Sequence, residues 1–271
     1  MKFRVLFLQT LLVIFVLVYI YPILLSIGGA FKWRSELFEP TLNPFPINFT
    51  LHNFVSLFEK VNVLNVLKNS MIIAIVAAFS NIFLCPLTAY PLAKSNFKGK
   101  RFFQLLVIFS MVQPFIAISI PLLGIVVMAG LQDTLFAATF PFLIYPMIVY
   151  FFMQSLTYIP DDLIDSARLD GAGELTILYR ILLPIIKATV GGSFLLTFIW
   201  IWNFYLWQLM VLRTTENMTY PVAVGMLSTS YFIYYGEVFA LTSLYIVPLL
   251  IIFLIMQKQI VSTMVLSGIK G

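Results

Sequence analysis

Long apolar runs constrain this chain more than any other feature of its sequence. A transmembrane helix needs about 20 consecutive, mostly apolar residues, and the 271-residue chain contains six such runs. Hydrophobic residues make up 61% of the chain and charged residues 10%, whereas a soluble domain has about 25% charged residues. We therefore predict an all-α integral membrane protein with six transmembrane helices. The predicted spans are residues 5–30, 69–93, 102–128, 135–157, 185–212 and 238–257.

Two details refine this prediction. The first run follows MKFR and extends from Val5 to about Ala30. It is longer than the apolar core of a secretory signal, about 7–15 residues, so we expect it to remain as an uncleaved first span. Prolines in the second and third spans predict kinks where neighbouring helices satisfy the freed carbonyls: Pro86, Pro91, Pro114 and Pro121.

The lysines and arginines predict the orientation in the membrane, because cytoplasmic loops are enriched in these residues. With the N-terminus inside, eleven basic residues fall in cytoplasmic segments and five outside, which favours both termini in the cytoplasm. The net charge of +5 then follows from topology, and we expect no nucleic-acid partner. The inner set is Lys2, Arg4, Lys94, Lys98, Lys100, Arg101, Arg168, Arg180, Lys187, Lys258 and Lys270; the outer set is Lys32, Arg34, Lys60, Lys68 and Arg213.

Residues for several kinds of chemistry are missing from the sequence. It has no GxxxxGK[ST] phosphate loop, no HExxH metal pair and no GxSxG nucleophile motif. Cys85 is the only cysteine and His52 the only histidine, so a Cys-rich metal site is excluded. Acidic residues that could couple transport to protons are nearly absent from the spans, and Glu237 lies at the edge of the last one. Any active transport would therefore draw its energy from another subunit.

In this topology, residues 158–184 form the largest cytoplasmic loop. Asp161 and Asp162 suit the first turn of a helix that we expect to end near Leu169. Gly171 then permits a left-handed turn, and a second helix is expected from about Glu174, with Leu175, Leu178 and Leu182 on one face until Pro184. On the first helix, Asp165 and Arg168 share one face, and Ile164 and Ala167 share another. The small side chains of Ser166 and Ala167 would let a partner approach the helix closely. These residues alone leave a solvated loop and a docking surface both open.

The sequence YIPDDLIDSARLDGAGELTILYRILLPIIK (158–187) resembles the EAA loop of the permease subunits of ABC importers. That pattern is E-A-A, three residues, G, nine residues and I-x-L-P, and this chain matches all of its positions with two conservative departures, Asp for Glu and Ser for Ala. The matching residues are Asp165, Ser166, Ala167, Gly171, Ile181, Leu183 and Pro184.

Other segments are similar to the maltose-type, carbohydrate-importing branch of these permeases. WNFYLWQL (202–209) resembles its WNxFLWPL, SGIKG (267–271) its terminal GxVKG, and KNS (68–70) its xNS entry to the second span. NPFPINFTLHNFVSLF (43–58) looks like the preceding loop, so the resemblance covers nearly the whole chain. Gln208, where the branch has proline, departs from the pattern and bears on substrate identity.

The resemblance implies a type I ABC importer permease fold in a bacterial or archaeal inner membrane. It implies a second permease subunit, two ATP-binding subunits that hold ATP and Mg²⁺, and an extracytoplasmic binding protein that delivers a sugar; this chain would bind no cofactor and catalyse no hydrolysis. The loop would dock on an ATPase subunit, and the tail at 264–271 could be a second contact. The implied coupling residues are Asp165, Ser166, Ala167, Arg168, Asp170, Gly171 and Pro184.

We expect three segments along the chain. Residues 1–65 form the first span and an external loop, 66–257 the transport domain with the coupling loop 158–184, and 258–271 a cytoplasmic tail. Within the outer loop, the spacing of apolar residues over 51–58 predicts a short helix at the membrane surface.

Sugars are held by aromatic faces together with a few hydrogen-bonding groups, and the fifth predicted span offers both. Trp and Tyr also gather at membrane interfaces, so that alternative stays open here. The candidate residues for a solute path are Trp202, Asn203, Tyr205, Gln208 and, in the third span, Gln113. Glycerol-phosphate or another polar solute is the alternative cargo, and a secondary transporter that needs no ATPase and an intramembrane enzyme are the alternative classes.

Overall fold

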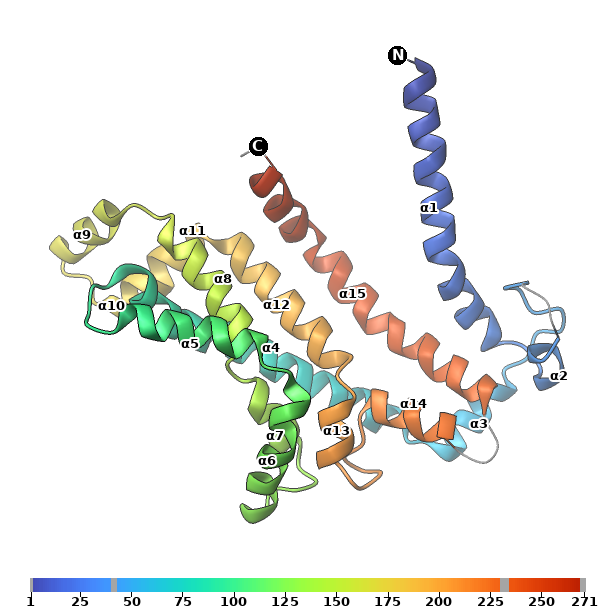
Figure 1. Cartoon of the computed structure of the whole chain (residues 1–271). Coiled ribbons are helices and arrows are strands. Elements are labelled where there is room, and N and C mark those ends of the chain that lie inside the picture. Colours follow the sequence, from blue (N-terminus) through green and yellow to red (C-terminus); the bar gives the residue numbers. More distant parts are fainter. Residues whose placement is uncertain (1, 40–42, 230–233, 269–271) are drawn as a thin grey trace. The chain divides into compact units, whose positions relative to one another are not determined.

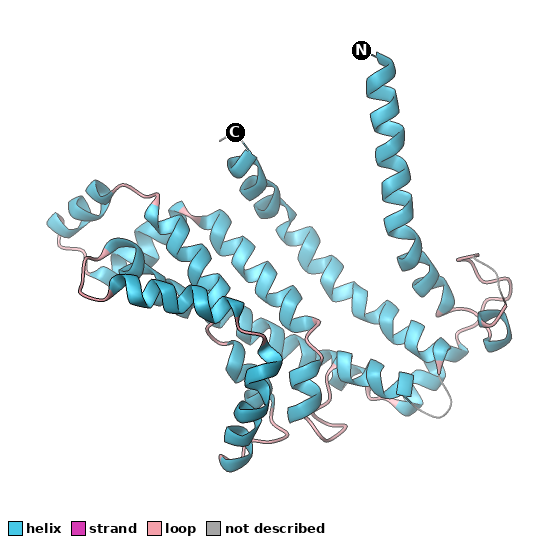
Figure 2. Ribbon diagram, viewed as in Figure 1, coloured by secondary structure: helices cyan, strands magenta, loops and turns pink. Residues whose placement is uncertain are grey.

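The computed structural model describes residues 2–39, 43–229 and 234–268, and every regular element in these ranges is helical (Figure 2). Figure 1 shows the elements in chain order. They are α1 (Lys2–Gly29), α2 (Arg34–Leu37), α3 (His52–Lys60), α4 (Val63–Lys94), α5 (Lys100–Val112), α6 (Phe115–Met128), α7 (Leu135–Thr139), η1 (Phe140–Phe142), α8 (Pro146–Thr157), α9 (Asp161–Leu169), α10 (Glu174–Thr176), η2 (Ile177–Leu182), α11 (Leu183–Ile185), α12 (Lys187–Trp202), α13 (Leu206–Val211), α14 (Tyr220–Thr229) and α15 (Tyr235–Gly268).

Within the described residues, four helical segments are long and apolar enough to cross a membrane, and two bent pairs bring the number to six if each pair is one span. These four segments correspond to the first, second, fourth and sixth predicted spans, and the fourth contains a short non-helical stretch at 143–145 between η1 and α8. The third is bent by 97° between α5 and α6, and the fifth by 87° between the segment Glu174–Ile185 and α12. The prediction of an all-α chain with six spans is therefore confirmed with each bent pair counted as one span, and two of the six are sharply bent.

The prolines explain one of these breaks. Pro114 is the N-cap of α6 and lies where the third span bends, because proline has no N–H to continue the α5 ladder. Pro121 lies inside α6, and α4 continues through Pro86 and Pro91. The end of the fifth span also differs from the prediction, since α12 stops at Trp202 rather than near 212.

The chain divides into two compact units, which we describe separately: Met1–Leu67 with Thr219–Leu249, and Lys68–Met218 with Leu250–Gly271. In the first unit, α3 confirms the predicted short helix. Its Ser56 hydroxyl donates to Glu237 at 2.8 Å, and Lys60 pairs with the same carboxylate. Val55 and Phe58 on the other side of α3 are more than half exposed, as expected of a helix that lies along a membrane surface.

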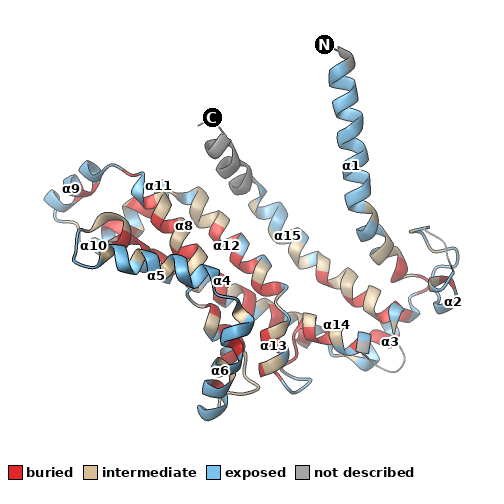
Figure 3. Cartoon of the chain, viewed as in Figure 1, coloured by how far each residue is buried: buried red, intermediate tan, exposed pale blue. Residues whose placement is uncertain are grey.

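The second unit has a continuous apolar core around α4, α8, α9 and η2 (Figure 3). Cys85 on α4 is fully buried in it, as a small packing residue. The break before α8 is satisfied by Asn81: its amide donates to the Phe142 carbonyl at 2.7 Å and accepts the Tyr145 N–H at 2.8 Å. Backbone polar groups inside a bilayer need such partners because lipid supplies none.

Candidate functional site

The segment 158–184, here called the elbow, consists of α9, a tight turn, and the helical elements α10, η2 and α11 that lead into α12 of the fifth span. Gly171 has φ +84°, the left-handed conformation that glycine adopts without strain. The Ala172 N–H donates to the Ala167 carbonyl and the Gly171 N–H to the Arg168 carbonyl, both at 3.0 Å. This is the Schellman pattern of helix ends. The predicted end of the first helix near Leu169 and the left-handed turn at Gly171 are confirmed.

One face of α9 is anchored in the core and the other is free. Ile164 is 2% and Ala167 8% exposed, and both pack into the core of the second unit. Ser166 and Asp170 are exposed, and Leu169 is 89% exposed. The prediction that Ile164 and Ala167 share a face is confirmed, but Ala167 points into the chain rather than to the outer surface, because the anchor needs a small apolar side chain there.

Arg168 binds two acidic residues of the elbow. The Arg168 guanidinium donates to Glu174 at 2.8 and 3.3 Å and to Asp165 at 3.2 Å. The hydrogen bond to Glu174 is the main cause that raises the pKa of Arg168 above its ordinary value. The Tyr90 hydroxyl of α4 donates to the Glu174 carboxylate at 2.7 Å. The network therefore joins α9 to the segment after the turn and to α4.

A second contact holds the start of α9. The Lys94 ammonium of α4 lies 2.7 Å from Asp161 and also donates to the Ile159 carbonyl. The hydrogen bond from Lys94 lowers the pKa of the Asp161 carboxyl below its ordinary value. The Lys94 side chain is only 7% exposed, so this cation lies almost entirely within the protein.

The segment after the turn differs in one respect from its prediction. Leu178 and Leu182 are buried, but Leu175 is 63% exposed. Residues 177–182 form a π-helix, and its i→i+5 hydrogen bonding turns each residue through a smaller angle than an α-helix does. The three leucines therefore do not remain on one stripe. Pro184 is exposed and lies in α11, just before the 87° bend.

The candidate solute-path residues of the fifth span fall at a helix break and differ in exposure. The α12 helix ends at Trp202, and residues 203–205 separate it from α13. Trp202 and Gln208 are each 1% exposed, whereas Asn203 is exposed and Tyr205 is 40% exposed. The Asn203 amide donates to the Ile199 carbonyl at 2.6 Å. Only Asn203 and Tyr205 of these four thus reach the surface of the chain.

This break packs against the break in the third span. Gln113 is the exposed C-cap of α5 at the 97° bend. Phe115, two residues later, contacts Phe204 and Trp207 edge-to-face, with ring centroids 5.1 and 5.9 Å apart. Two interruptions of helical backbone, far apart in sequence, therefore lie side by side.

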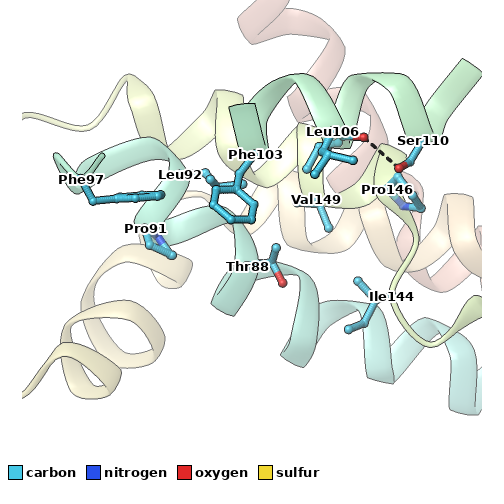
Figure 4. A pocket seen from close by; sticks show the side chains of 11 residues that line it. Thr88, Pro91, Leu92, Phe97, Phe103, Leu106, Ser110, Ile144, Pro146 and Val149 are labelled. Atoms are coloured by element: carbon cyan, nitrogen blue, oxygen red, sulfur yellow. Dashed lines mark hydrogen bonds between the residues drawn. The ribbon is translucent and has the colours of Figure 1, made fainter. Parts of the chain in front are cut away.

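A groove elsewhere in the second unit has a different character. It has a volume of about 480 Å³ and is lined by residues of α4, α5 and α8 together with Phe97 and Ile144 (Figure 4). Its lining is almost wholly apolar, and the Ser110 hydroxyl is bonded to the Leu106 carbonyl of its own helix at 2.8 Å. A sugar site needs converging hydrogen-bonding groups, so this groove does not suit one.

Sequence patterns missed several residues that organise these regions. No sequence pattern points to Tyr90, and Lys94 enters the sequence analysis only as one of the basic residues that predict the orientation. Asp133 is a further example: it has φ +58° and accepts hydrogen bonds from the N–H groups of Arg213 and Thr214 at 2.8 and 3.1 Å. Burial disfavours its carboxylate, but these bonds and those from the Thr214 and Asn217 side chains keep its pKa below the ordinary value. In the sequence, the available signal for Asp133 is that it is an isolated acidic residue shortly after Gly130.

Comparison with known proteins identifies the family to which this chain belongs. Residues 86–265 match the family described as binding-protein-dependent transport system inner membrane component. This chain is a member of that family. The matched region contains the elbow and both helix breaks, so the sites described above lie within the part that the permease shares with its family.

Relatives cover almost the whole permease. It is 32% identical to the arabinooligosaccharides transport system permease protein AraQ of Bacillus subtilis, over 94% of this chain and 92% of that protein. It is 30% identical to the lactose transport system permease protein LacG of Rhizobium radiobacter, over 93% and 91% of the two chains. A chain in the crystal structure of a bacterial ABC transporter involved in the import of the acidic polysaccharide alginate superposes with a TM-score of 0.77. That chain is 23% identical, with 95% of this chain and 96% of that chain covered, and it supports the type I importer permease fold.

Proposed function

We propose that this permease is the membrane-spanning subunit of an ATP-driven importer and that it transports a sugar or oligosaccharide. The elbow carries this proposal. Its inner face is anchored by Ile164 and Ala167 in the core, and its outer face presents Ser166, Leu169 and Asp170. A helix that is anchored on one side and exposed on the other suits docking on a partner that pushes or pulls it.

The partner on the elbow would be an ATP-binding subunit, of which the complex would contain two, with ATP and Mg²⁺ bound there. A second permease and an extracytoplasmic binding protein would complete the importer. The distribution of basic residues, eleven against five, supports a cytoplasmic elbow and cytoplasmic termini. The predicted contact through the tail at 264–271 includes residues outside those whose side chains the structure describes.

A sugar is the proposed cargo because the similar permeases named above are named for arabinooligosaccharides and lactose. Another relative, 29% identical over 84% of this chain, is the melibiose/raffinose/stachyose import permease protein MelC of Bacillus subtilis. We propose that the solute passes the paired breaks of the third and fifth spans. Non-helical backbone is tolerated at membrane depth only inside protein or beside a water-filled cavity, and Gln113, Asn203 and Tyr205 reach the surface there.

Purification of the intact complex from its native membrane tests this proposal. A second permease and an ATPase should accompany the tagged chain, and ATP hydrolysis in nanodiscs should rise with the binding protein and one of arabinotriose, lactose or raffinose. Stimulation by glycerol-3-phosphate alone would show that the cargo is wrong. Uptake by the purified chain without any ATPase would overturn the importer itself.

A further inference from the structure

Two side chains at the end of α4 hold opposite ends of the coupling helix α9. Lys94 binds Asp161 in its first turn and the Ile159 carbonyl just before it. Tyr90 binds Glu174, which holds Arg168 in the last turn of α9. Residues four apart lie on the same side of a helix, so one face of α4 reaches both ends of α9.

The two contacts are not ordinary surface ion pairs. The Arg168–Glu174 pair alone is about half exposed on each side, and such pairs contribute little to stability. Tyr90, however, is only 7% exposed and connects this pair to the packed part of α4. Lys94 is equally buried along its side chain, and a buried ammonium needs acceptors for its protons. Lys94 donates to Asp161 and to the Ile159 carbonyl, and both of these acceptors belong to the elbow.

The apolar contact between α9 and the core is small and lies at the middle of the helix, whereas these two polar contacts lie at its ends. Only Ile164 and Ala167 of α9 are buried, and they occupy the middle of its inner face. Apolar contacts are not directional, so this anchor alone permits α9 to rock or slide over the core. Hydrogen bonds at both ends restrict these movements, because each requires a defined distance and angle.

We propose that Tyr90 and Lys94 are positioning residues for energy coupling: they make α9 and the end of α4 move as one body, so that displacement of the elbow is transmitted to the second span. This inference rests on the proposed function, because it presumes that an ATPase moves the elbow. It adds that the force enters the spans through α4 as well as through the covalent connections to α8 and α11.

Distance measurement between spin labels tests this directly, without the transported solute. The labels are placed at Asp162→Cys on α9, an exposed position outside the proposed docking residues, and at Val76→Cys on α4, a 46% exposed position. The background carries Cys85→Ala and cysteine-free partner subunits. The complex is assembled with its ATPase and second permease in nanodiscs, shown to hydrolyse ATP, and measured without nucleotide and after trapping with MgATP and vanadate.

With native Tyr90 and Lys94, we expect one narrow distance distribution whose mean is the same in both states. Tyr90→Phe combined with Lys94→Met should lose that single distribution in the trapped state, and Lys94→Arg alone should retain it because a cation can still reach the same acceptors. Tyr179→Phe is the matched control, since the Tyr179 hydroxyl also donates to an α4 carbonyl, that of Phe83, and this hydrogen bond does not involve α9. This control should keep the narrow distribution.

A mean distance that shifts on trapping with the native residues, or a double variant that keeps the narrow distribution, would overturn the inference and leave the proposed function intact. A complex that contains no ATPase or hydrolyses no ATP would instead overturn the proposed function, and the inference with it.

Discussion

The elbow and the break at 203–205 both place polar residues between apolar helices, yet they use them in different ways. In the elbow, Arg168 binds Asp165 and Glu174 within a few residues of sequence, and the turn is fixed by hydrogen bonds of the same short range. The distant Tyr90 and Lys94 of α4 add further contacts to this local network. At the break, the surroundings come from distant segments: the Trp207 indole donates to the Ala137 carbonyl at 3.0 Å, and Phe115 packs against Phe204.

This difference shows why similar residues have different exposures in the two regions. Local hydrogen bonds leave the elbow's charged groups at the surface, where a partner can reach them. At the break, packing against distant segments of the chain buries Trp202 and Gln208 but leaves Asn203 and Tyr205 exposed. We therefore expect substitutions in the elbow to affect coupling, and substitutions at the break to affect either solute recognition or packing according to exposure.

The largest effect is expected at Gly171. Gly171→Val places a β-branched residue at φ +84°, a conformation that costs a residue with a Cβ about 1–2 kcal/mol and suits β-branched residues least. The turn should change its geometry, and ATP-dependent uptake should be abolished while the permease remains at normal levels in the membrane. Uptake and ATPase activity measured in the same vesicles check this.

Gly173→Ala is its matched control. Gly173 has φ −72°, which any residue adopts, and a Cβ added there meets no atom within 4 Å. Uptake by this variant should stay near the native rate. Normal transport by Gly171→Val would mean that the elbow is only a solvated connector.

The next effect concerns the anchor of α9. Ile164→Ala removes a side chain that is 2% exposed, and such truncations cost about 2–5 kcal/mol. The coupling helix should detach from the core more readily, seen as faster hydrogen exchange of α9 amides and lower stimulated ATPase activity. Leu163→Ala, at a 39% exposed neighbouring position, should leave amide exchange of α9 unchanged; equal exchange in the two variants would contradict the anchor.

A smaller effect is expected at the break. Asn203→Leu removes an exposed amide, and loss of such polar recognition costs about 1–3 kcal/mol, roughly a tenfold rise in the KM for uptake. Basal ATP hydrolysis and assembly should not change. Gln208→Leu, at a position only 1% exposed, should instead lower thermal stability with little change in KM. A KM unaffected by Asn203→Leu would assign this residue to structure alone.

The last prediction concerns topology and is measured by cysteine labelling rather than by transport. In a Cys85→Ala background, Asp170→Cys should resist an impermeant thiol reagent in intact cells, whereas Asn43→Cys should react. Both positions are exposed on the chain, so the difference would report the side of the membrane. Reversed labelling would place the elbow outside the cell and exclude its docking on a cytoplasmic ATPase.

The sequence by itself determined the spans, the end of α9, the left-handed turn at Gly171 and the family. These features depend on composition, on the 3.6-residue helical period and on the special conformational freedom of glycine, all of which act over a few neighbouring residues. The charge pair between Asp165 and Arg168 was predictable for the same reason, since residues three apart are neighbours on a helix.

Only the tertiary structure decided which of the polar residues are buried and what they bind. Tyr90 and Lys94 lie 84 and 67 residues from their acidic partners in the elbow, a separation at which no helical period relates their positions. Trp202 and Asn203 are adjacent in sequence, yet one is buried and the other exposed, because a helix turns neighbouring side chains to different sides and packing with distant segments selects the side that is covered.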